Sequence, residues 1–418
     1  MTGSQAFAKL KPTGWIRSVR LDDIVLMLLL IAALFNYGSV WMGLSGGTII
    51  ALRAACLAPG MVVAAFLVLR GRATPLGVAV LGYSLLRMVQ GCFAVNPGNA
   101  ILQGMLALLV FVVPKRFADR YGADKTVSLV FWAFLFVTVA MDLFVFSTNG
   151  DGYLVHESEW SWSSNYIFGS KFMLAYINML FFGLCLYKLS SRVLAVLLAA
   201  FCISACSVAQ CSTGVTGILV MAGVYLAYGP LKAILNSKWC VFGIVILMAG
   251  ISVGAAELFQ LPIVQSFIVG VLGESSDLTG RLTIYPHLVR LWFEQPWLGY
   301  GSDGAVNLLM MNSISAPNTQ EGLFQILFSN GLVGGGLFLA VCVFSLRNVS
   351  RLERCGRGVY AFVVAMAFCS LVEINLSALF LLGLSLVNVI TSSAFGTEIV
   401  SVAEGGYGER VGRRSNGT

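Results

Sequence analysis

The sequence predicts an all-α, polytopic membrane protein of about twelve transmembrane helices, with one large extracytoplasmic loop that carries short amphipathic helices. Three observations predict this class. The 418 residues are 58% hydrophobic and only 11% charged, whereas soluble domains carry about a quarter charged residues. Apolar stretches of the roughly 20 residues needed to cross a bilayer recur along the chain. Basic residues gather in every second connection between those stretches.

The first apolar stretch is expected to remain as a membrane anchor. Lys9, Lys11, Arg17 and Arg20 precede the apolar run Ile24–Leu34, and no small-residue cleavage site follows. This pattern differs from that of a cleavable signal peptide. We therefore expect residues 1–20 in the cytoplasm, nine spans within 21–256, a large outer catalytic loop at 257–322, three spans within 323–396, and a disordered cytoplasmic tail at 397–418.

The expected spans follow one another in order along the chain. They cover residues 21–38, 47–69, 75–94, 99–114, 127–147, 167–187, 193–209, 214–230, 239–256, 323–346, 359–377 and 378–396. The last two spans are adjacent, so the chain between them must turn tightly.

The placement of Lys and Arg tests this division of the chain into spans and connections, because short cytoplasmic loops retain positive charge. With the N-terminus inside, the inner connections hold Arg70 and Arg72; Lys115, Arg116, Arg120 and Lys125; Lys188 and Arg192; Lys232 and Lys238; and Arg347, Arg351, Arg354 and Arg357. The outer connections hold almost none. This alternation predicts a topology in which both termini are cytoplasmic.

Five of the 26 Lys and Arg residues escape the cytoplasmic side: Arg53, Arg87, Lys171, Arg281 and Arg290. An arginine within a span is costly and needs a partner or a ligand. One interpretation is that Arg53 and Arg87 reach the outer headgroups, or pair with Asp142 or Glu373. The other is a pocket for a polyanion at the outer leaflet, because guanidinium groups suit phosphate oxygens.

The large outer loop is 66 residues long, and loops longer than about 15 residues are usually functional. Apolar residues at Leu288, Leu291, Trp292 and Trp297 predict a short amphipathic helix. Pro286 is expected in its first turn, and Pro296 with Gly299 is expected to end it. His287, Arg290 and Glu294 are expected to share one helix face. Because Pro286 is expected to interrupt any helix between them, no geometry follows for Arg281 and Arg290.

A second outer loop, Ser147–Tyr166, combines acidic and aromatic residues. It contains Asp151, His156, Glu157, Glu159, Trp160 and Trp162. Indole rings with acidic neighbours suit sugar stacking and hydroxyl binding, although Trp residues also gather at membrane interfaces in general.

Glycine-containing motifs follow one another in the second half of the chain. Thr279-Gly280-Arg281 is followed by Gln295-Pro296-Trp297-Leu298-Gly299-Tyr300-Gly301 and then by the segment Gly322–Gly334. This order resembles the signature of the O-antigen ligase and O-antigen polymerase superfamily. Arg290, ten intervening residues and Gly301 also fit an Arg-x10-Gly spacing of some polymerases, and Asn165–Lys171 is similar to their Phe-Gly-x-Lys-Asn stretch. The resemblance covers the topology and roughly residues 165–335.

The chain also departs from that signature. Many ligases carry His-Asn eleven residues before the glycine aligned with Gly331, where this chain has Gln320-Glu321. Cys211–Gly214 replaces a frequent arginine before the eighth span, and Phe172 stands in place of the polymerase asparagine. These departures favour a polymerase-type member over a ligase.

The resemblance implies a membrane-embedded glycosyltransferase of the GT-C type in the bacterial cytoplasmic membrane. Such a polymerase transfers a glycan from a polyprenyl-pyrophosphate carrier to a sugar hydroxyl of another lipid-linked repeat unit at the outer face. It needs no cofactor. Its donor and acceptor are lipid-linked oligosaccharides within the membrane, other polysaccharide-assembly proteins are further partners to expect, and nucleic acid is not.

The resemblance and the charge placement together give the expected site residues. Glu321 is the expected base because it occupies the catalytic stretch, with His287 as the alternative. The expected pyrophosphate ligands are Arg281 and Arg290, then Lys171, Arg53 and Arg87; the expected glycan ligands are Trp160, Trp162, Glu294 and Asp303. The alternative for Glu321 is a solvated carboxylate at a loop end. No metal site is expected, because the ten cysteines and two histidines lack ligand spacing.

Two other functions remain open for the sequence. A ligase would use the same donor and join the glycan to a different acceptor. A transporter or lipid-oligosaccharide flippase would show repeated halves and charges near the bilayer midplane. The chain shows no similarity between its halves, and its exceptional charges lie outward.

Overall fold

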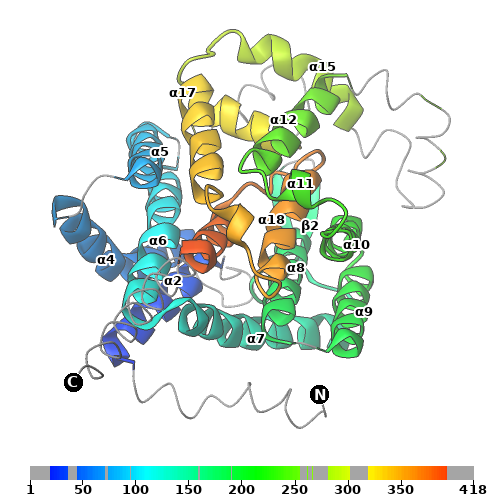
Figure 1. Cartoon of the computed structure of the whole chain (residues 1–418). Coiled ribbons are helices and arrows are strands. Elements are labelled where there is room, and N and C mark those ends of the chain that lie inside the picture. Colours follow the sequence, from blue (N-terminus) through cyan, green and yellow to red (C-terminus); the bar gives the residue numbers. More distant parts are fainter. Residues whose placement is uncertain are drawn as a thin grey trace, which may run out of the picture.

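The computed structural model describes residues 19–35, 45–70, 74–94, 96–158, 161–189, 191–254, 261, 266, 281–301 and 319–392. The described chain is almost entirely helical, as Figure 1 shows. The all-α class predicted from the sequence is confirmed for these residues.

An apolar helix lies in each of the twelve segments predicted to span the membrane. They are α2 (Leu21–Leu34), α4 (Gly46–Arg70), α5 (Pro75–Gly91), α6 (Pro97–Tyr121), α7 (Ala123–Ser147), α8 (Lys171–Lys188), α9 (Arg192–Val208), α10 (Ser212–Leu226), α12 (Cys240–Val253), α17 (Gly322–Ser345), α18 (Arg357–Cys369) and a last helix, Ala378–Ser392. Among the described residues, five helices are long and apolar enough to cross a membrane: Gly46–Leu67, Pro97–Tyr121, Ala123–Ser147, Lys171–Lys188 and Gly322–Arg351. The protein is therefore a helical membrane protein, and the number of twelve crossings stays a prediction.

Local sequence signals set several helix starts. Thr74 precedes α5, and its hydroxyl accepts a hydrogen bond from the Gly77 N–H at 3.1 Å, with Pro75 at the first helical position. Asn96 accepts from Asn99 N–H at 3.5 Å at the start of α6, again before a proline. Both arrangements satisfy an N–H group that the first turn of a helix leaves free.

Contacts between helix ends agree with the predicted pairing of connections. Asp23 at the start of α2 accepts from Arg120 at 2.7 Å and from Tyr121 at 2.8 Å, both at the end of α6. Asn388 donates to Ser345 O at 3.1 Å. Arg120 and Tyr121 belong to a connection predicted to be cytoplasmic, and Asp23 and Ser345 lie near the ends of spans predicted to face the same side. Which side faces the cytoplasm stays a prediction.

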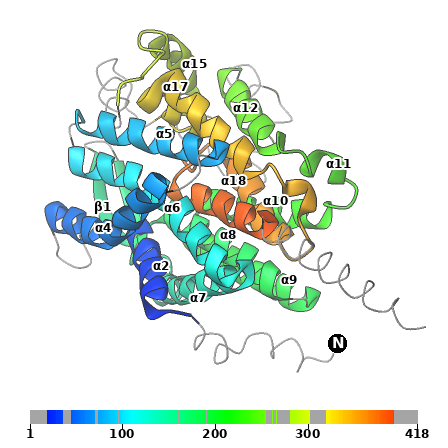
Figure 2. The ribbon, with the colours of Figure 1, turned by 60° about the vertical axis from the view of Figure 1, so that its left-hand side comes forward.

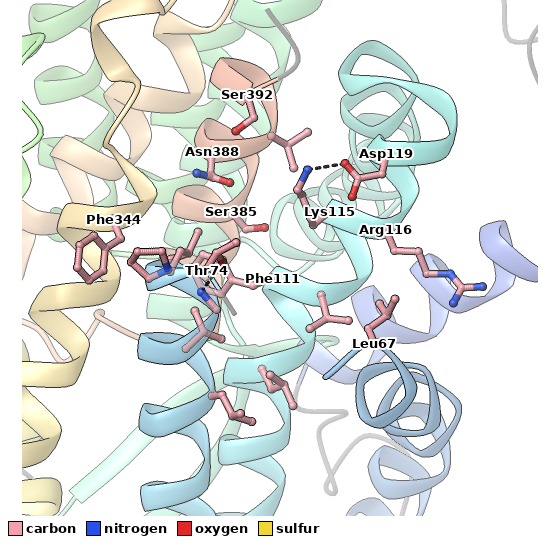
Figure 3. A pocket seen from close by; sticks show the side chains of 18 of the residues that line it. Leu67, Thr74, Phe111, Lys115, Arg116, Asp119, Phe344, Ser385, Asn388 and Ser392 are labelled. Atoms are coloured by element: carbon pink, nitrogen blue, oxygen red, sulfur yellow. Dashed lines mark hydrogen bonds and ion pairs between the residues drawn. The ribbon is translucent and has the colours of Figure 1, made fainter. Parts of the chain in front are cut away.

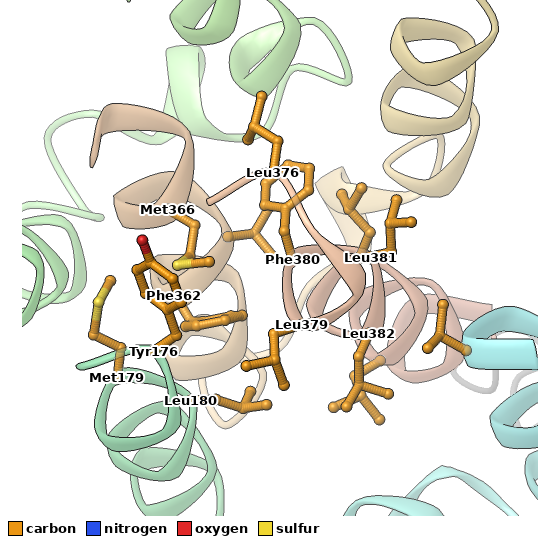
Figure 4. Packing of buried hydrophobic residues seen from close by; sticks show 14 of the residues in the cluster. Tyr176, Met179, Leu180, Phe362, Met366, Leu376, Leu379, Phe380, Leu381 and Leu382 are labelled. Carbon is orange, nitrogen blue, oxygen red and sulfur yellow. The ribbon is translucent and has the colours of Figure 1, made fainter. Parts of the chain in front are cut away.

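One part of the buried core lies between α8, α18 and the helix Ala378–Ser392. Phe362 and Phe380 are fully buried in it, and Figure 4 shows their rings among side chains from all three helices. Two helices meet closely where a Cβ on Gly183 would lie 2.8 Å from the carbonyl oxygen of Gly358. Small residues at such crossings allow the backbones of membrane helices to approach.

The helix α17 is broken at Gly331, which has φ +63° and ψ −167°. The segment 296–301 lies against the break and satisfies the backbone groups that the break frees. Leu332 N–H donates to Pro296 O at 2.7 Å and Val333 N–H to Trp297 O at 3.1 Å; Tyr300 N–H donates to Phe328 O at 2.7 Å and Gly301 N–H to Ser329 O at 3.0 Å. Within a membrane such groups must be paired inside the protein.

The side chain of Gln90 in α5 also contacts the break. Gln90 donates through Nε2 to Leu298 O at 2.5 Å and accepts from Asn330 Nδ2 at 2.5 Å. Figure 2 shows α5 beside α17. The break therefore joins α5, α17 and the segment 296–301.

The helix α15 (Arg281–Trp292) differs in its start from the sequence prediction. It begins five residues before Pro286, which was expected in its first turn. A proline in a helix interior removes a hydrogen bond and costs about 3 kcal/mol. Burial of Ile284, Leu288 and Leu291 against the bundle offsets this cost, because each is at least 95% buried.

A small sheet, which the sequence analysis did not predict, lies between α7 and α8. Strands β1 (Tyr153–Ser158), β2 (Ser161–Tyr166) and β3 (Gly169–Ser170) pair antiparallel in that order. Helix α8 consequently begins at Lys171, whereas a span was expected from residue 167.

We predict that Gly331→Ala lowers the stability of the protein by more than about 2 kcal/mol, because residues with a side chain resist a positive φ. A Cβ at this position would also lie 2.1 Å from Trp297 O. Gly336→Ala is the matched control, since a Cβ there meets nothing within 4 Å. Thermal unfolding of the detergent-purified variants measures both. Equal melting temperatures for the two variants would contradict the described break.

Candidate functional site

Glu321 is fully buried at the first turn of α17. It is the N-cap residue, and its Oε2 accepts a hydrogen bond from the Phe324 N–H. Its other oxygen, Oε1, is buried and has no hydrogen-bond partner among the described residues. The alternative of a solvated loop-end carboxylate is therefore wrong. A buried oxygen without a partner is rare in proteins and needs an explanation.

Burial also sets the protonation of Glu321, which immediately precedes the span. Loss of water raises the pKa of its carboxyl group to about 8, although the N–H groups of Phe324 and Leu323 act in the opposite direction. A carboxyl group with such a pKa exchanges its proton near neutral pH, which is the property that a general acid or base requires.

Three separate segments enclose Glu321. Gly322 N–H donates to Ser370 O at 2.8 Å, which joins the start of α17 to the turn that follows α18. From α15, the hydroxyl of Tyr285 lies 2.8 Å from Leu371 O and 3.4 Å from Gln320 O. Helix α15 thus lies at the end of the bundle, beside α12 and α17 (Figure 1).

A second buried carboxylate and a lysine lie near the start of α10 (Ser212–Leu226). Glu373 is 4% exposed and accepts from Thr213 Oγ1 at 3.4 Å, at the start of α10. Lys171 donates to Gln210 O at 3.4 Å, in the turn just before α10. These bonds place Lys171 and Glu373 at the end of the bundle where Glu321 lies.

The backbone is strained at two non-glycine residues that contact or adjoin the candidate site residues. Gln320, beside Glu321, has φ +56°, and Gln210, which bonds Lys171, has φ +52°. Residues with side chains adopt such angles only when their surroundings enforce them, and such positions cluster at functional sites.

The structure places Arg53 and Arg87 apart from Lys171. Arg53 is 3% exposed and donates to Ala33 O at 3.2 Å and to Asn99 Oδ1 at 3.3 Å, between α2, α4 and α6. Arg87 lies over the ring of Tyr83 at 5.7 Å, and its buried Nε has no hydrogen-bond partner among the described residues. Asp142, the partner weighed for these arginines, accepts from Asn178 Nδ2 at 2.9 Å.

His287 and Arg290 are exposed on α15, as their spacing predicted. Glu294 was expected on the same face, but the helix ends at Trp292 and Glu294 lies in the turn that follows. The buried side of the helix carries Ile284, Leu288 and Leu291. His287 is therefore in solvent, whereas Glu321 is enclosed. Arg281 and Arg290 lie nine positions apart in this one helix, and at 3.6 residues per turn their Cα atoms fall on opposite sides of its axis.

Some expected site residues lie outside the described part of the chain. Trp160 and Asp303 are among them, and for Trp162 and Arg281 only the backbone is described. Their roles stay predictions. Among the described residues, no group of three His, Cys, Asp or Glu side chains could hold a metal ion.

The sequence analysis missed three contributors to this end of the bundle: Tyr285, Thr213 and the Gln90–Asn330 pair. A signal was present for the pair, because Gln90 and Asn330 are uncharged polar residues within apolar segments. Polar residues in such segments bond across helices. Nothing in the sequence linked Tyr285 to the turn after α18.

No model of a known protein family and no curated protein matches this chain.

We predict that the stability of the protein falls with rising pH because of Glu321. Its folded-state pKa of about 8 lies above the ordinary value of 4.5. Between these two pH values the folded state therefore binds one proton more than the unfolded state. The stabilisation is complete below about pH 4.5 and is lost as the pH rises through 8, at up to about 1.4 kcal/mol per pH unit. Glu321→Gln should remove this part of the pH dependence in urea unfolding at pH 5 to 9.

The control for this measurement is Glu353→Gln, an exposed carboxylate in the connection after α17. It should keep the wild-type pH dependence. The same slope in wild type and Glu321→Gln would show that the Glu321 carboxyl group is already ionised in the folded protein.

Proposed function

We propose that this protein is a polysaccharide polymerase that uses a polyprenyl-pyrophosphate-linked glycan as donor at the outer face of a bacterial cytoplasmic membrane. The observation that carries the proposal is the buried carboxyl group of Glu321 at the start of the broken helix α17. The two glycine segments that resemble the O-antigen superfamily, 295–301 and 322–334, meet at that break. The resemblance and the enclosed carboxyl group thus concern the same end of α17.

The proposed reaction joins two lipid-linked glycans. A hydroxyl oxygen of the acceptor sugar attacks the anomeric carbon of the donor sugar, and the bond between that carbon and the pyrophosphate oxygen breaks. The hydroxyl proton passes to Glu321, and polyprenyl pyrophosphate leaves with the bonding electron pair. Release of polyprenyl pyrophosphate drives the transfer, so no nucleotide sugar is needed outside the cell.

Glu321 supports this role through its environment. In the ionised form its Oε1 is an unpaired acceptor in a dry site, so it binds a hydroxyl proton strongly. A base is most effective when its pKa lies near the working pH, and burial places the pKa of Glu321 at about 8. His287 on the exposed face of α15 has no comparable environment.

Cations at the same end would stabilise the charge that develops on the pyrophosphate. Lys171 is the first choice, because its ammonium group bonds a carbonyl oxygen at 3.4 Å, lies 5.6 Å from the ring centre of Phe172 and forms none of the ion pairs within the described residues. Arg281 and Arg290 lie on α15, which contacts the Glu321 segment through Tyr285. Arg281 and Arg290 lie on opposite sides of this helix, so we expect them to contact different groups of the substrate.

We predict that Glu321→Gln lowers the rate of polymer formation by about 10² to 10⁴, the usual contribution of a general base. Purified protein in vesicles that contain a lipid-linked repeat unit provides the assay, with product length read by gel electrophoresis. The wild-type rate should rise with pH up to about 8, as Glu321 ionises. Glu353→Gln should retain wild-type activity. Full activity of Glu321→Gln would remove Glu321 as the base.

A separate prediction concerns the cations. Lys171→Ala, Arg281→Ala and Arg290→Lys should each lower the rate by about 10² to 10³, because each removes or weakens a cationic contact to a charged group of the substrate. The matched control is Arg354→Ala, an exposed arginine in the predicted cytoplasmic connection after α17. Unchanged polymer length and amount in the three variants would remove these residues from the site. Transfer to an acceptor other than a lipid-linked repeat would identify a ligase.

A further inference from the structure

A cavity of about 700 Å³ lies at the opposite end of α17 from Glu321. It is formed by the adjoining ends of α4, α5, α6, α17 and the helix Ala378–Ser392 (Figure 3). This volume is typical of sites that enclose a small organic molecule or part of a larger one. The polymerase proposal assigns no role to this cavity.

The wall of the cavity is apolar and continues onto the outer surface of the bundle. Leu81, Leu108 and Phe111 line its interior. Phe66 and Leu67 line its edge on α4 and are 48% and 38% exposed. Helices α4 and α5 both pack on α6, and the cavity lies over α6 between their ends. In a membrane such an opening is continuous with the acyl chains of the bilayer.

The rim of the cavity is basic. Lys115, Arg116, Arg120 and Arg347 line it together with a single carboxylate, Asp119. Figure 3 shows Lys115 and Asp119 of α6 near Asn388 and Ser392 of the last helix. Counting Asp23 as well, which pairs with Arg116 and Arg120, four positive and two negative charges leave a net charge of +2.

The excess charge has a definite place on the rim. Arg116 and Arg120 bond the buried carboxylate of Asp23, and Lys115 bonds Asp119. Arg347 is exposed and takes part in none of the ion pairs within the described residues. Hydroxyl and amide groups of Ser385, Asn388 and Ser392 lie beside these cations. The rim therefore offers positive charge and hydrogen-bonding groups directly above an apolar wall.

We propose that this cavity is a binding site for an anionic phospholipid of the leaflet on that side of the membrane. An acyl chain would lie along the apolar wall, and the phosphate would contact Lys115 and Arg347. Basic pockets between transmembrane helices bind anionic headgroups for this reason. All four rim cations belong to connections predicted to be cytoplasmic, so the lipid would come from the cytoplasmic leaflet. The proposal does not rest on the polymerase function.

Native mass spectrometry of the full chain in detergent, with added lipid, tests the site. Phosphatidylglycerol and phosphatidylcholine with identical acyl chains are compared, because they differ in headgroup charge. We expect a complex with phosphatidylglycerol that withstands activation, and at least fivefold weaker binding of phosphatidylcholine. One cation near a headgroup is worth about fivefold in affinity.

Two kinds of variant locate the binding. Lys115→Gln combined with Arg347→Gln should weaken phosphatidylglycerol binding by about tenfold or more. Val112→Trp fills part of the cavity without a change of charge and should weaken it as well. Arg354→Gln, which removes an exposed charge from the same connection outside the cavity, should bind as wild type does.

Several results would overturn the proposal. Equal binding of the two lipids would show that the positive charge of the rim does not contribute to lipid binding. Wild-type binding by Val112→Trp would show that the lipid binds outside the cavity. Displacement of the lipid by inorganic phosphate alone would reduce the site to an anion site. Tighter binding of polyprenyl phosphate than of phosphatidylglycerol, lost in the same variants, would assign the cavity to the carrier lipid. Loss of polymerase activity would contradict nothing here, because the readout is lipid binding.

Discussion

The break in α17 at Gly331 is the feature on which the candidate site depends. Interrupting a helix inside a membrane frees backbone groups that water cannot reach, and each costs free energy unless it finds a partner. The segment 296–301 supplies four such partners, two carbonyl groups and two N–H groups. Gly299 is needed for the approach, because a Cβ there would lie 2.4 Å from Phe328 O. The broken helix and the segment therefore form one structural unit.

This unit also fixes what lies around Glu321. Tyr300 follows Gly299 and donates its hydroxyl to Leu291 O at 2.8 Å, so the segment holds the end of α15. Tyr285, two turns earlier in α15, reaches the turn after α18 beside Glu321. The start of α17 favours a negative charge through its free N–H groups, yet the pKa of Glu321 is raised, because burial outweighs them. The break in α17 thus positions the segments that bury Glu321. This burial raises the pKa of its carboxyl group into the range of a base that acts near neutral pH.

Features that depend on the local sequence could be predicted, whereas features that depend on contacts between distant segments could not. Each predicted span contains a helix, because a bilayer imposes both a length and an apolar composition on every crossing segment. The exposed face of α15 with His287 and Arg290 was also predictable, since it follows from helical spacing. The burial of Glu321 was not, because residues 285 and 370, both far from the start of α17 in sequence, enclose it. The hairpin of β1 and β2 was missed as well, since its polar strands lack an alternating apolar pattern.

Three of the four cations on the cavity rim bond carboxylates, whereas Lys171 at the candidate site does not, and this difference bears on the proposed reaction. Arg116, Arg120 and Lys115 bond carboxylates, whereas Lys171 donates to a neutral carbonyl oxygen. Cations bonded to neutral groups keep their full attraction for an incoming anion. In the proposed reaction, bound pyrophosphate would raise the pKa of Glu321 further, because like charges disfavour ionisation. The carboxylate would then be the stronger base while the donor is bound. Departure of the pyrophosphate would lower the pKa again, so the captured proton would be released after the glycan has been transferred.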